Sequence, residues 1–265
     1  MPKQNHAIGV FDSGLGGLTV VKELMRQMPG EDVVYFGDTA RVPYGTKSAE
    51  SIVRFSKENV AVLLRHKVKM IVVACNSSSS HALGTLKKTY TLPILGVIEP
   101  GVKKAVAVTK KRTVGVIATP ATINSGAYAR QIRRSGRRIK VISQACPLFV
   151  PLVEEGWFNR AETISIAGEY LSGIRRAKAD ALILGCTHYP LLKQVLRKVM
   201  GPKVYLVDSA REVAQEARAL LVKKGLARAG KRKGKYLFLV SDEPKHFQKL
   251  ARRFLGCPVG KVKRV

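Results

Sequence analysis

Two short apolar runs in this chain each end at a cysteine that small polar residues follow immediately. One run spans residues 70–74 and leads into Cys75, and the other spans residues 181–185 and leads into Cys186. A short apolar run bounded by polar residues is typical of a buried strand, and small polar residues favour the start of a helix. This repeated strand–cysteine–helix pattern favours a fold built from buried parallel strands.

A second repeat lies upstream of each cysteine. The apolar run 8–11, with Asp12 and Ser13 after it, precedes the first cysteine, and the run 113–117, with Thr119 shortly after it, precedes the second. The two separations are similar, although they are not identical. We therefore expect two related α/β halves, each of which presents one sulfur to a shared cleft.

Strands and helices are predicted to alternate along the chain, which indicates an α/β fold with mostly parallel sheets flanked by helices. The predicted strands cover residues 8–11, 33–36, 70–74, 93–98, 113–117, 139–143, 181–184, 204–207 and 236–240. The predicted helices cover residues 18–28, 49–66, 102–110, 123–135, 161–176, 190–200, 210–224 and 243–255. A basic, glycine-interrupted turn is expected at 227–235.

The composition is that of a globular protein, with 46% hydrophobic residues among 265 and no apolar run of membrane-spanning length. The first residues lack the apolar segment of a signal peptide, so we expect a cytoplasmic protein. The cysteines are widely spaced, and none forms a pair at zinc-binding spacing. They are Cys75, Cys146, Cys186 and Cys257. We therefore expect reduced thiols, no disulfide framework and no metal site.

The chain is strongly basic. Its formal net charge of +29 arises from 47 Lys and Arg residues against 18 Asp and Glu residues. Such a chain is expected to attract polyanions at low salt, but no RNA-recognition, helix-turn-helix or zinc-finger pattern accompanies the charge. Two interpretations stay open: a solvated basic surface that attracts polyanions without specificity, and a specific contact with nucleic acid or a nucleic-acid enzyme.

A cysteine between a strand and a helix start lies near backbone N–H groups, and these groups lower the pKa of a thiol. One such thiol would favour a hydrolase or transferase with a His and an orienting acid nearby. Two equivalent thiols favour opposed bases on either side of one substrate carbon. That pair suits stereoinversion, because one base removes a proton and the other delivers one to the opposite face.

Three further residues stand out. Asp12 and His188 each allow a structural and a functional interpretation, and Cys146 allows a structural one. Asp12 begins a glycine-rich turn, residues 12–17, and is placed either to cap the next helix or to face a ligand. His188 lies two residues after Cys186 and is either a hydrogen-bonded structural residue or a group that assists the thiol. Cys146 precedes a proline and lacks the strand-to-helix setting, so we expect a structural role for it.

Five segments occur in the order and spacing of one known family. They are Phe-Asp-Ser-Gly-Leu-Gly-Gly at 11–17, Gly-Asp-Thr-Ala-Arg-Val-Pro-Tyr-Gly at 37–45, Ala-Cys-Asn at 74–76, Gly-Val-Ile-Glu-Pro-Gly at 96–101 and Leu-Gly-Cys-Thr-His-Tyr-Pro-Leu-Leu at 184–192. On these motifs the chain resembles the glutamate racemases, of the cofactor-independent aspartate/glutamate racemase superfamily, over nearly its whole length.

The resemblance implies interconversion of L- and D-glutamate without pyridoxal phosphate or metal, which supplies D-glutamate for peptidoglycan synthesis. It implies that Cys75 handles the α-proton of the D-isomer and that Cys186 handles that of the L-isomer. The residues implied to assist the thiols are Asp12, Asp38, Glu154 and His188. The residues implied to bind substrate are Asp12, Ser13, Tyr44, Gly45, Asn76, Ser77, Thr187 and His188, with Thr119 and Thr122 as further candidates for carboxylate contacts.

The same resemblance implies two pseudo-symmetric domains with the active site in the cleft between them. Residues 1–98 and 209–265 would form the first domain, because the end of the chain returns to complete it. Residues 99–208 would form the second. We also expect a homodimer.

One departure from the family lies at residues 77–80, which are four serines where the family usually has Thr-Ala-Ser-Ala. Ser77 keeps a hydroxyl for a carboxylate but lacks a methyl group, so we expect the reaction to be preserved and the affinity to be affected. Two alternatives stay open: a two-cysteine racemase acting on aspartate or a hydantoin, and a racemase scaffold whose basic surface binds nucleic acid.

Overall fold

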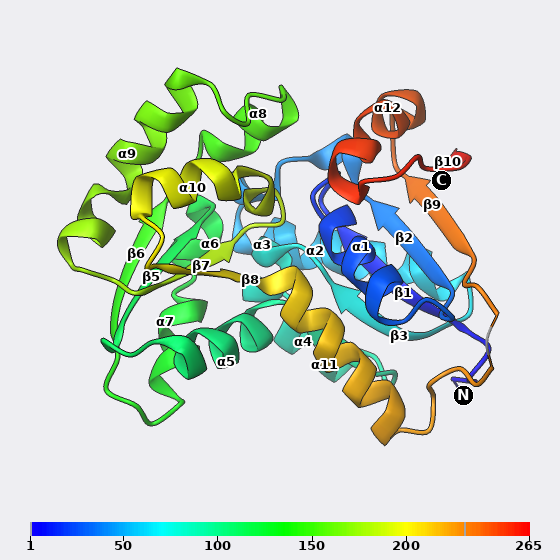
Figure 1. Cartoon of the computed structure of the whole chain (residues 1–265). Helices are drawn as coiled ribbons and strands as arrows, with labels where there is room; N and C mark the ends of the chain where they lie inside the picture. The colour runs from blue at the N-terminus through cyan, green and yellow to red at the C-terminus, as the bar shows by residue number, and fades with distance from the viewer. Residues whose placement is uncertain (1, 231) are drawn as a thin grey trace.

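Two parallel sheets, each covered by helices, make up the chain in a computed structural model that describes residues 2–230 and 232–265 (Figure 1). The predicted α/β class with parallel sheets flanked by helices is confirmed. Lys231, within the basic turn expected at 227–235, lies outside the described residues.

The first sheet has six strands in the order β10–β9–β2–β1–β3–β4. They are β1 (Ala7–Asp12), β2 (Val33–Gly37), β3 (Val68–Val73), β4 (Ile94–Gly96), β9 (Tyr236–Val240) and β10 (Val262–Arg264). All neighbouring strands are parallel, and β1 lies between β2 and β3, with Phe11 opposite Phe36 and Val73. Every residue of β1, β2 and β3 is buried, as expected for strands covered on both faces.

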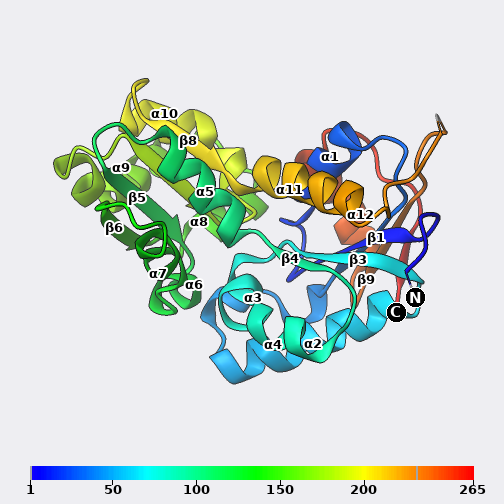
Figure 2. The ribbon, with the colours of Figure 1, turned by 90° about the horizontal axis from the view of Figure 1, so that it is seen from below.

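Helices from both ends of the chain cover this sheet. Figure 2 shows α1, α11 and α12 above it and α2, α3 and α4 below it. These helices are α1 (Leu18–Gln27), α2 (Ala49–Leu64), α3 (Asn76–His81), α4 (Leu83–Thr89), α11 (Ser209–Lys223) and α12 (Pro244–Leu255). Two short 3-10 turns, η1 (Thr39–Arg41) and η2 (Tyr44–Thr46), lie between β2 and α2.

The second sheet has four parallel strands in the order β6–β5–β7–β8. They are β5 (Thr113–Ala118), β6 (Lys140–Ala145), β7 (Ala181–Gly185) and β8 (Tyr205–Asp208). The helices and the turn of this part are α5 (Ile98–Val108), α6 (Pro120–Asn124), α7 (Ala127–Arg133), α8 (Phe149–Glu154), α9 (Ala161–Arg176), α10 (Lys193–Met200) and η3 (Tyr189–Leu192). Helix α9 packs on β6 and α10, whereas α5 packs on β7 and α7.

Several helices begin at a residue whose side chain accepts a backbone hydrogen bond. The Ser48 hydroxyl accepts from the N–H of Ser51 at 3.2 Å, as the sequence predicts for α2. Asp208 caps α11 in the same way, by accepting from the N–H of Ala210 at 3.0 Å. Each cap satisfies a donor that the first turn of a helix leaves free.

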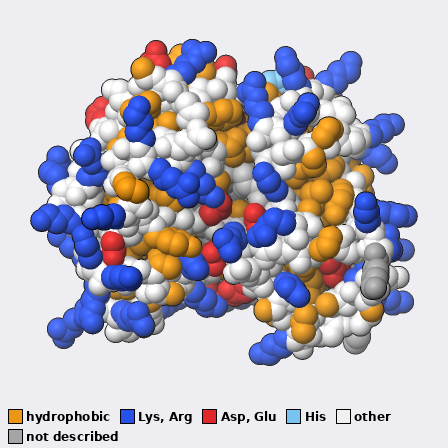
Figure 3. All heavy atoms as spheres, in the orientation of Figure 1, with side chains coloured by type: hydrophobic (Ala, Val, Ile, Leu, Met, Phe, Trp, Pro, Cys, Tyr) orange, Lys and Arg blue, Asp and Glu red, His pale blue; other side chains and the backbone are white. Residues whose placement is uncertain are grey.

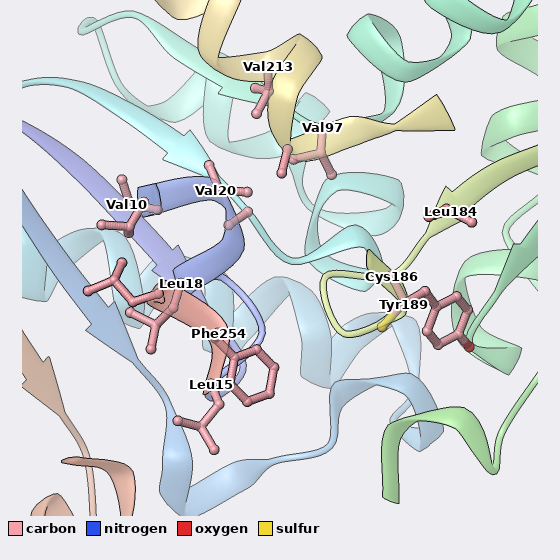
Figure 4. Close-up of a cluster of buried hydrophobic side chains, with 14 of the residues drawn as sticks. Val10, Leu15, Leu18, Val20, Val97, Leu184, Cys186, Tyr189, Val213 and Phe254 are labelled. Atoms are coloured by element: carbon pink, nitrogen blue, oxygen red, sulfur yellow. The ribbon is translucent and has the colours of Figure 1, made fainter. Parts of the chain in front are cut away.

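The largest hydrophobic cluster is continuous between the two sheets. It runs from Val10 and Leu18 beside the first sheet to Leu184, Cys186 and Tyr189 beside the second (Figure 4). Two separate clusters fill the other faces, one under the first sheet and one under the second. Because the main cluster is continuous, strands of both sheets end within one packed interior.

The structure corrects two sequence-based boundaries and adds one strand at the edge of the first sheet. The strand predicted at 93–98 is only Ile94–Gly96, and α5 begins at Ile98 instead of at residue 102. The helix predicted at 123–135 is two helices, α6 and α7, because Gly126 adopts a left-handed conformation with φ of 62° between them. Strand β10, at the edge of the first sheet, was not predicted.

Within the part of the chain that the structure describes, no helix combines the length and the apolar character needed to cross a membrane.

Candidate active site

The carboxyl ends of the central strands of both sheets meet in one place. Asp12 ends β1, and Cys75 follows β3 two residues after its end at Val73. Thr119 follows β5, and Cys186 follows β7. Side chains from the two sides touch directly here, since the Thr187 hydroxyl lies 3.4 Å from Asp12 Oδ1. Ligands bind at this end of parallel strands, so the position is that of a site between two α/β units.

Cys75 is the buried residue that immediately precedes α3. It is 5% exposed and packs with Tyr44, Ile52, Phe55 and Ala121. Burial raises the pKa of its thiol to about 12, and the neighbouring Asp12 adds to the increase. The backbone N–H and the hydroxyl of Ser78 act in the opposite direction. The thiol is therefore protonated at rest, and forming the thiolate requires help from its surroundings.

Cys186 has a histidine as its partner. Its sulfur lies 3.8 Å from Nδ1 of His188, and Nε2 of that imidazole lies 3.0 Å from Oε1 of Glu154 on α8. Burial lowers the pKa of His188, but the hydrogen bonds with Cys186 and Glu154 outweigh burial and raise it to about 10. The ring of Phe254 on α12 packs edge-on against the imidazole, with centroids 5.4 Å apart. His188 thus carries a positive charge beside the sulfur at neutral pH.

Asp12 is fully buried, and it accepts hydrogen bonds from within its own turn. The N–H of Gly14 donates to its Oδ2 at 3.1 Å. Burial raises the pKa of Asp12, while the charge on His188 and the hydrogen bonds from Gly17, Gly14 and Thr187 oppose this increase. Helix α1 begins after Gly17, without a side-chain cap, so Asp12 does not serve as its N-cap residue.

The glycine-rich turn after Asp12 is in close contact with the opposite half. A Cβ added at Gly16 would lie 2.1 Å from the hydroxyl of Thr187 and 2.5 Å from Nδ1 of His188. Only glycine leaves room for these two side chains. The hydroxyl of Thr19 at the start of α1 also donates to the carbonyl of Thr187 at 3.2 Å. The turn therefore sets the position of Thr187 and His188.

Three buried hydroxyls from the two halves form a cluster. Ser77 Oγ lies 3.1 Å from Thr119 Oγ1 and 3.4 Å from Thr122 Oγ1, and the two threonine oxygens are 3.1 Å apart. All three residues are less than 9% exposed. Gly45 approaches this cluster closely, because a Cβ there would lie 2.6 Å from Cβ of Thr119. Hydroxyls in this arrangement can donate to a carboxylate.

Asn76 is held by Tyr128, a residue outside the motifs of the sequence. The Tyr128 hydroxyl on α7 donates to Oδ1 of Asn76 at 2.7 Å, and both residues are buried. Tyr128 lies inside a basic helical stretch and carries no local motif, so only its tertiary position identifies it. The contact leaves the amide NH₂ of Asn76 as the donor group for another partner.

Asp38 and Tyr44 belong to a network that surrounds the site. Asp38 is fully buried and accepts hydrogen bonds from Tyr44, from Arg41 at 2.7 Å and from Ser241 at 2.9 Å. Asn59 donates to the Tyr44 hydroxyl at 3.0 Å. Burial and then the charge on Asp38 raise the pKa of Tyr44, which keeps that hydroxyl protonated. The network positions Tyr44, which packs beside Cys75.

The other predicted residues lie as follows. Ser13 is buried within the turn after Asp12. A cavity of about 370 Å³ opens beside the site and is lined in part by Gly14, Val42 and Glu154. Cys146 is fully buried in the main hydrophobic cluster, whereas Cys257 is exposed. In residues 2–230 and 232–265, no three His, Cys, Asp or Glu side chains gather as a group that could hold a metal.

The sequence matches a known family and close full-length relatives. The family is Asp/Glu/Hydantoin racemase, and the match covers residues 8–217. A glutamate racemase from Geobacter metallireducens is 50% identical over 259 residues, which cover 98% of this chain and 96% of that protein. A glutamate racemase from Syntrophus aciditrophicus is 48% identical over 260 residues, with the same two coverages of 98% and 96%.

Solved structures agree in fold over the whole chain. A glutamate racemase isoform from Bacillus anthracis superposes with a TM-score of 0.95 at 37% identity, covering 99% of this chain and 98% of that one. A glutamate racemase from Francisella tularensis in complex with D-glutamate gives 0.92 at 41% identity, with the same coverages of 99% and 98%. An aspartate racemase from Picrophilus torridus, at 18% identity and a TM-score of 0.62, shares the fold. This chain therefore belongs to the Asp/Glu/Hydantoin racemase family and is an amino-acid racemase.

Proposed function

We propose that this chain interconverts L-glutamate and D-glutamate, with Cys75 and Cys186 as bases on opposite faces of the α-carbon. One observation carries the proposal. The two cysteines follow strands of the two different sheets, and each has its own titratable neighbour, Asp12 for Cys75 and His188 for Cys186. A single nucleophilic cysteine would not require this duplication, whereas a pair of opposed bases would.

Glutamate is the substrate that the relatives favour. Proteins named glutamate racemase match at 44–50% identity in sequence and at 37–41% among structures with TM-scores above 0.9. The aspartate racemase from Picrophilus torridus is only 18% identical. Selection between the two substrates depends on one methylene group, which a site discriminates by about 1–3 kcal/mol.

The hydroxyls of Ser77, Thr119 and Thr122 are proposed to bind a substrate carboxylate. Both halves contribute to this buried group, and its three hydroxyls bond one another. The Asn76 amide, whose oxygen is already bonded to Tyr128, would add an N–H donor. Hydrogen bonds to a charged carboxylate are stronger than bonds between neutral groups, so the cluster can both bind and orient the substrate.

The proposed reaction removes a proton from one face of the α-carbon and delivers another to the opposite face through the two thiols. With D-glutamate bound, the Cys75 thiolate takes the α-proton, the C–H bond breaks, and its electron pair stays on the α-carbon beside the carboxylate. The Cys186 thiol then donates its proton to the opposite face of that carbon. The products are L-glutamate, a Cys75 thiol and a Cys186 thiolate. L-Glutamate reacts by the reverse sequence, and proton exchange with solvent restores the starting state.

The two thiols are proposed to be assisted in different ways. The protonated imidazole of His188, held by Glu154, stabilises the Cys186 thiolate through its positive charge. Asp12 lies near Cys75 and, because burial raises its pKa, it is suited to accept or return a proton there. Asp38 acts at a distance, by positioning Tyr44. Thr187, Ser13 and Gly45 complete the substrate-binding surface.

The wider role follows from the reaction. We propose that the product D-glutamate is used in peptidoglycan synthesis, and that the enzyme works in the cytoplasm without a cofactor. We also propose that residues 1–98 with 209–265, and residues 99–208, form its two domains. The pairing of β9 with β2, and of β8 with β7, supports this division.

Two proposals concern partners. The first is a homodimer, which analytical ultracentrifugation tests. The second is non-specific attraction of polyanions, supported by the Lys and Arg side chains spread over the face seen in Figure 3. Retention on DNA should weaken steeply as salt rises if the attraction is non-specific, and should survive physiological salt if a specific contact exists.

The function is tested by circular dichroism of L-glutamate, D-glutamate and L-aspartate, each incubated with metal-free and cofactor-free protein. We expect the signals of both glutamate enantiomers to decay and that of aspartate to persist. Cys75→Ala and Cys186→Ala should each abolish the decay in both directions, while Cys257→Ala, which changes an exposed cysteine, serves as the control. Either active-site variant turning over glutamate at the wild-type rate would refute the two-base assignment.

A further inference from the structure

Ser78 carries a buried hydroxyl that makes none of the contacts described for the active site. The residue is 0% exposed, and among the described residues its Oγ has no hydrogen-bond partner. A buried hydroxyl without a partner destabilises a fold, so proteins rarely retain one. The neighbouring serines differ in this respect. Ser79 donates to the carbonyl of Val73 at 2.9 Å, and Ser80 donates to the carbonyl of Ser77 at 2.9 Å.

The position of Ser78 directs this hydroxyl to one sulfur. Cys75 immediately precedes α3, and Ser78 is the third residue of that helix. In this relation the side chain before the helix and the groups of the third residue lie side by side. The backbone N–H and the hydroxyl of Ser78 are the only two groups among the main influences on Cys75 that favour its thiolate.

The surroundings explain why the sulfur needs such a donor. Asp12 at the end of β1 and Cys186 on the opposite side both raise the pKa of Cys75, in addition to the effect of burial. Tyr44, which packs with Cys75, and Tyr35 stay protonated, because burial raises their pKa values and a charge on Cys75 would raise them further. Cys186 has a cationic imidazole beside it, whereas no cation is among the main influences on Cys75.

We propose that Ser78 is a positioning residue that donates a hydrogen bond from its hydroxyl to the Cys75 thiolate as that thiolate forms. The hydroxyl rotates toward the sulfur when the negative charge appears, and it supplies on this side part of the stabilisation that His188 supplies to Cys186. In the structure this hydroxyl makes no hydrogen bond of normal geometry among the described residues, so it is free to turn toward the sulfur. The inference adds a residue to the proposed racemisation, and the effect expected on turnover rests on that proposed function.

The experiment measures the thiolate itself and needs no turnover. Wild type and Ser78→Ala are treated with iodoacetamide at several fixed pH values between 7 and 9, and the alkylation rate of Cys75 is followed by peptide mass spectrometry. A lost hydrogen bond to a charged group corresponds to about one unit of pKa. Because a more basic thiolate is also more nucleophilic, the expected rate falls by about three- to fivefold at each pH. Cys186 in the same samples serves as an internal reference.

Ser79→Ala is the matched control, since it removes a hydroxyl one residue further along that bonds only backbone groups. It should lower the melting temperature and leave the alkylation rate of Cys75 unchanged. Ser78→Ala should fold at least as well as wild type, because it removes an unsatisfied group. Ser78→Cys, with a weaker donor, should give an intermediate rate. An unchanged rate in Ser78→Ala, or an equal fall in Ser79→Ala, would overturn the proposal.

Racemisation provides a second readout. The two enantiomers have equal free energy in water, so the kcat/KM of Ser78→Ala must fall by the same factor in both directions, about tenfold. If the wild-type protein fails to racemise glutamate but the alkylation rates still differ, the proposed function fails and the role of Ser78 at the sulfur stands. If racemisation occurs and the alkylation rates are equal, only the role of Ser78 fails.

Discussion

Replacing Gly16 by alanine tests whether the glycine-rich turn fixes Thr187 and His188. The added Cβ would lie 2.1 Å from the Thr187 hydroxyl and 2.5 Å from Nδ1 of His188, whereas ordinary contact begins at 3.4 Å. The hydroxyl must therefore move by about 1.3 Å, or the turn must move away from it. A displacement of about 1 Å in a catalytic arrangement lowers rates by about 100-fold. Overpacking also destabilises a fold by about 1–3 kcal/mol.

We therefore expect Gly16→Ala to lower kcat/KM for glutamate by about 100-fold while the protein stays folded at 25 °C. The assay is circular dichroism of each glutamate enantiomer, with the melting temperature measured in parallel. Gly84→Ala is the control, because a Cβ at Gly84 in α4 meets nothing within 4 Å. That variant should keep full activity and gain about 0.4–1 kcal/mol of stability. A folded Gly16→Ala protein with wild-type kcat/KM would refute the reasoning.

Three more predictions concern the groups around the thiols. Thr122→Val removes a hydroxyl from the cluster with Ser77 and should raise the KM for glutamate about tenfold in steady-state assays; an unchanged KM would contradict the carboxylate role. Tyr44→Phe leaves buried Asp38 without one donor and should lower the free energy of unfolding by about 1–3 kcal/mol, measured by urea denaturation; equal stability would count against the network. The pKa of His188 is raised from 6.5 to about 10, so its stabilising contribution is complete below pH 6.5 and disappears as the pH rises through 10. The stability difference between wild type and His188→Gln should therefore shrink over that range in denaturation series, and a difference that grows with pH would exclude this account.

The strand-to-cysteine pattern could be predicted from sequence because its information is local. Cys75 and Cys186 each follow an uninterrupted apolar run, and such a run is a strand in both halves of the structure. Contacts between the halves could not be predicted in this way. Nothing in the sequence near Tyr128 indicates that its hydroxyl bonds Asn76, a residue 52 positions away. The candidate residues were found from motifs, whereas their partners appear only in the folded chain.

Boundary errors have a similar physical origin. Residues 93–98 are apolar throughout, and a short apolar run fits a buried strand and a buried helix start equally well. Gly126 interrupts a helical pattern without a proline, so its left-handed conformation was not expected. Lys69 can be fully buried within β3 because its ammonium group donates a hydrogen bond to the buried carboxylate of Glu31, 38 residues away. The sequence around a lysine in an apolar strand does not identify the acidic residue that pairs with it.

The most direct test of the two-base account is racemisation of L-glutamate in D₂O, followed by ¹H NMR and chiral separation at early times. If Cys186 removes the proton and Cys75 delivers another, the first D-glutamate formed carries deuterium at the α-carbon. The L-glutamate that remains keeps its protium. If D-glutamate forms with its original proton, or if L-glutamate gains deuterium as fast as D-glutamate appears, a single base serves both faces and the account is wrong.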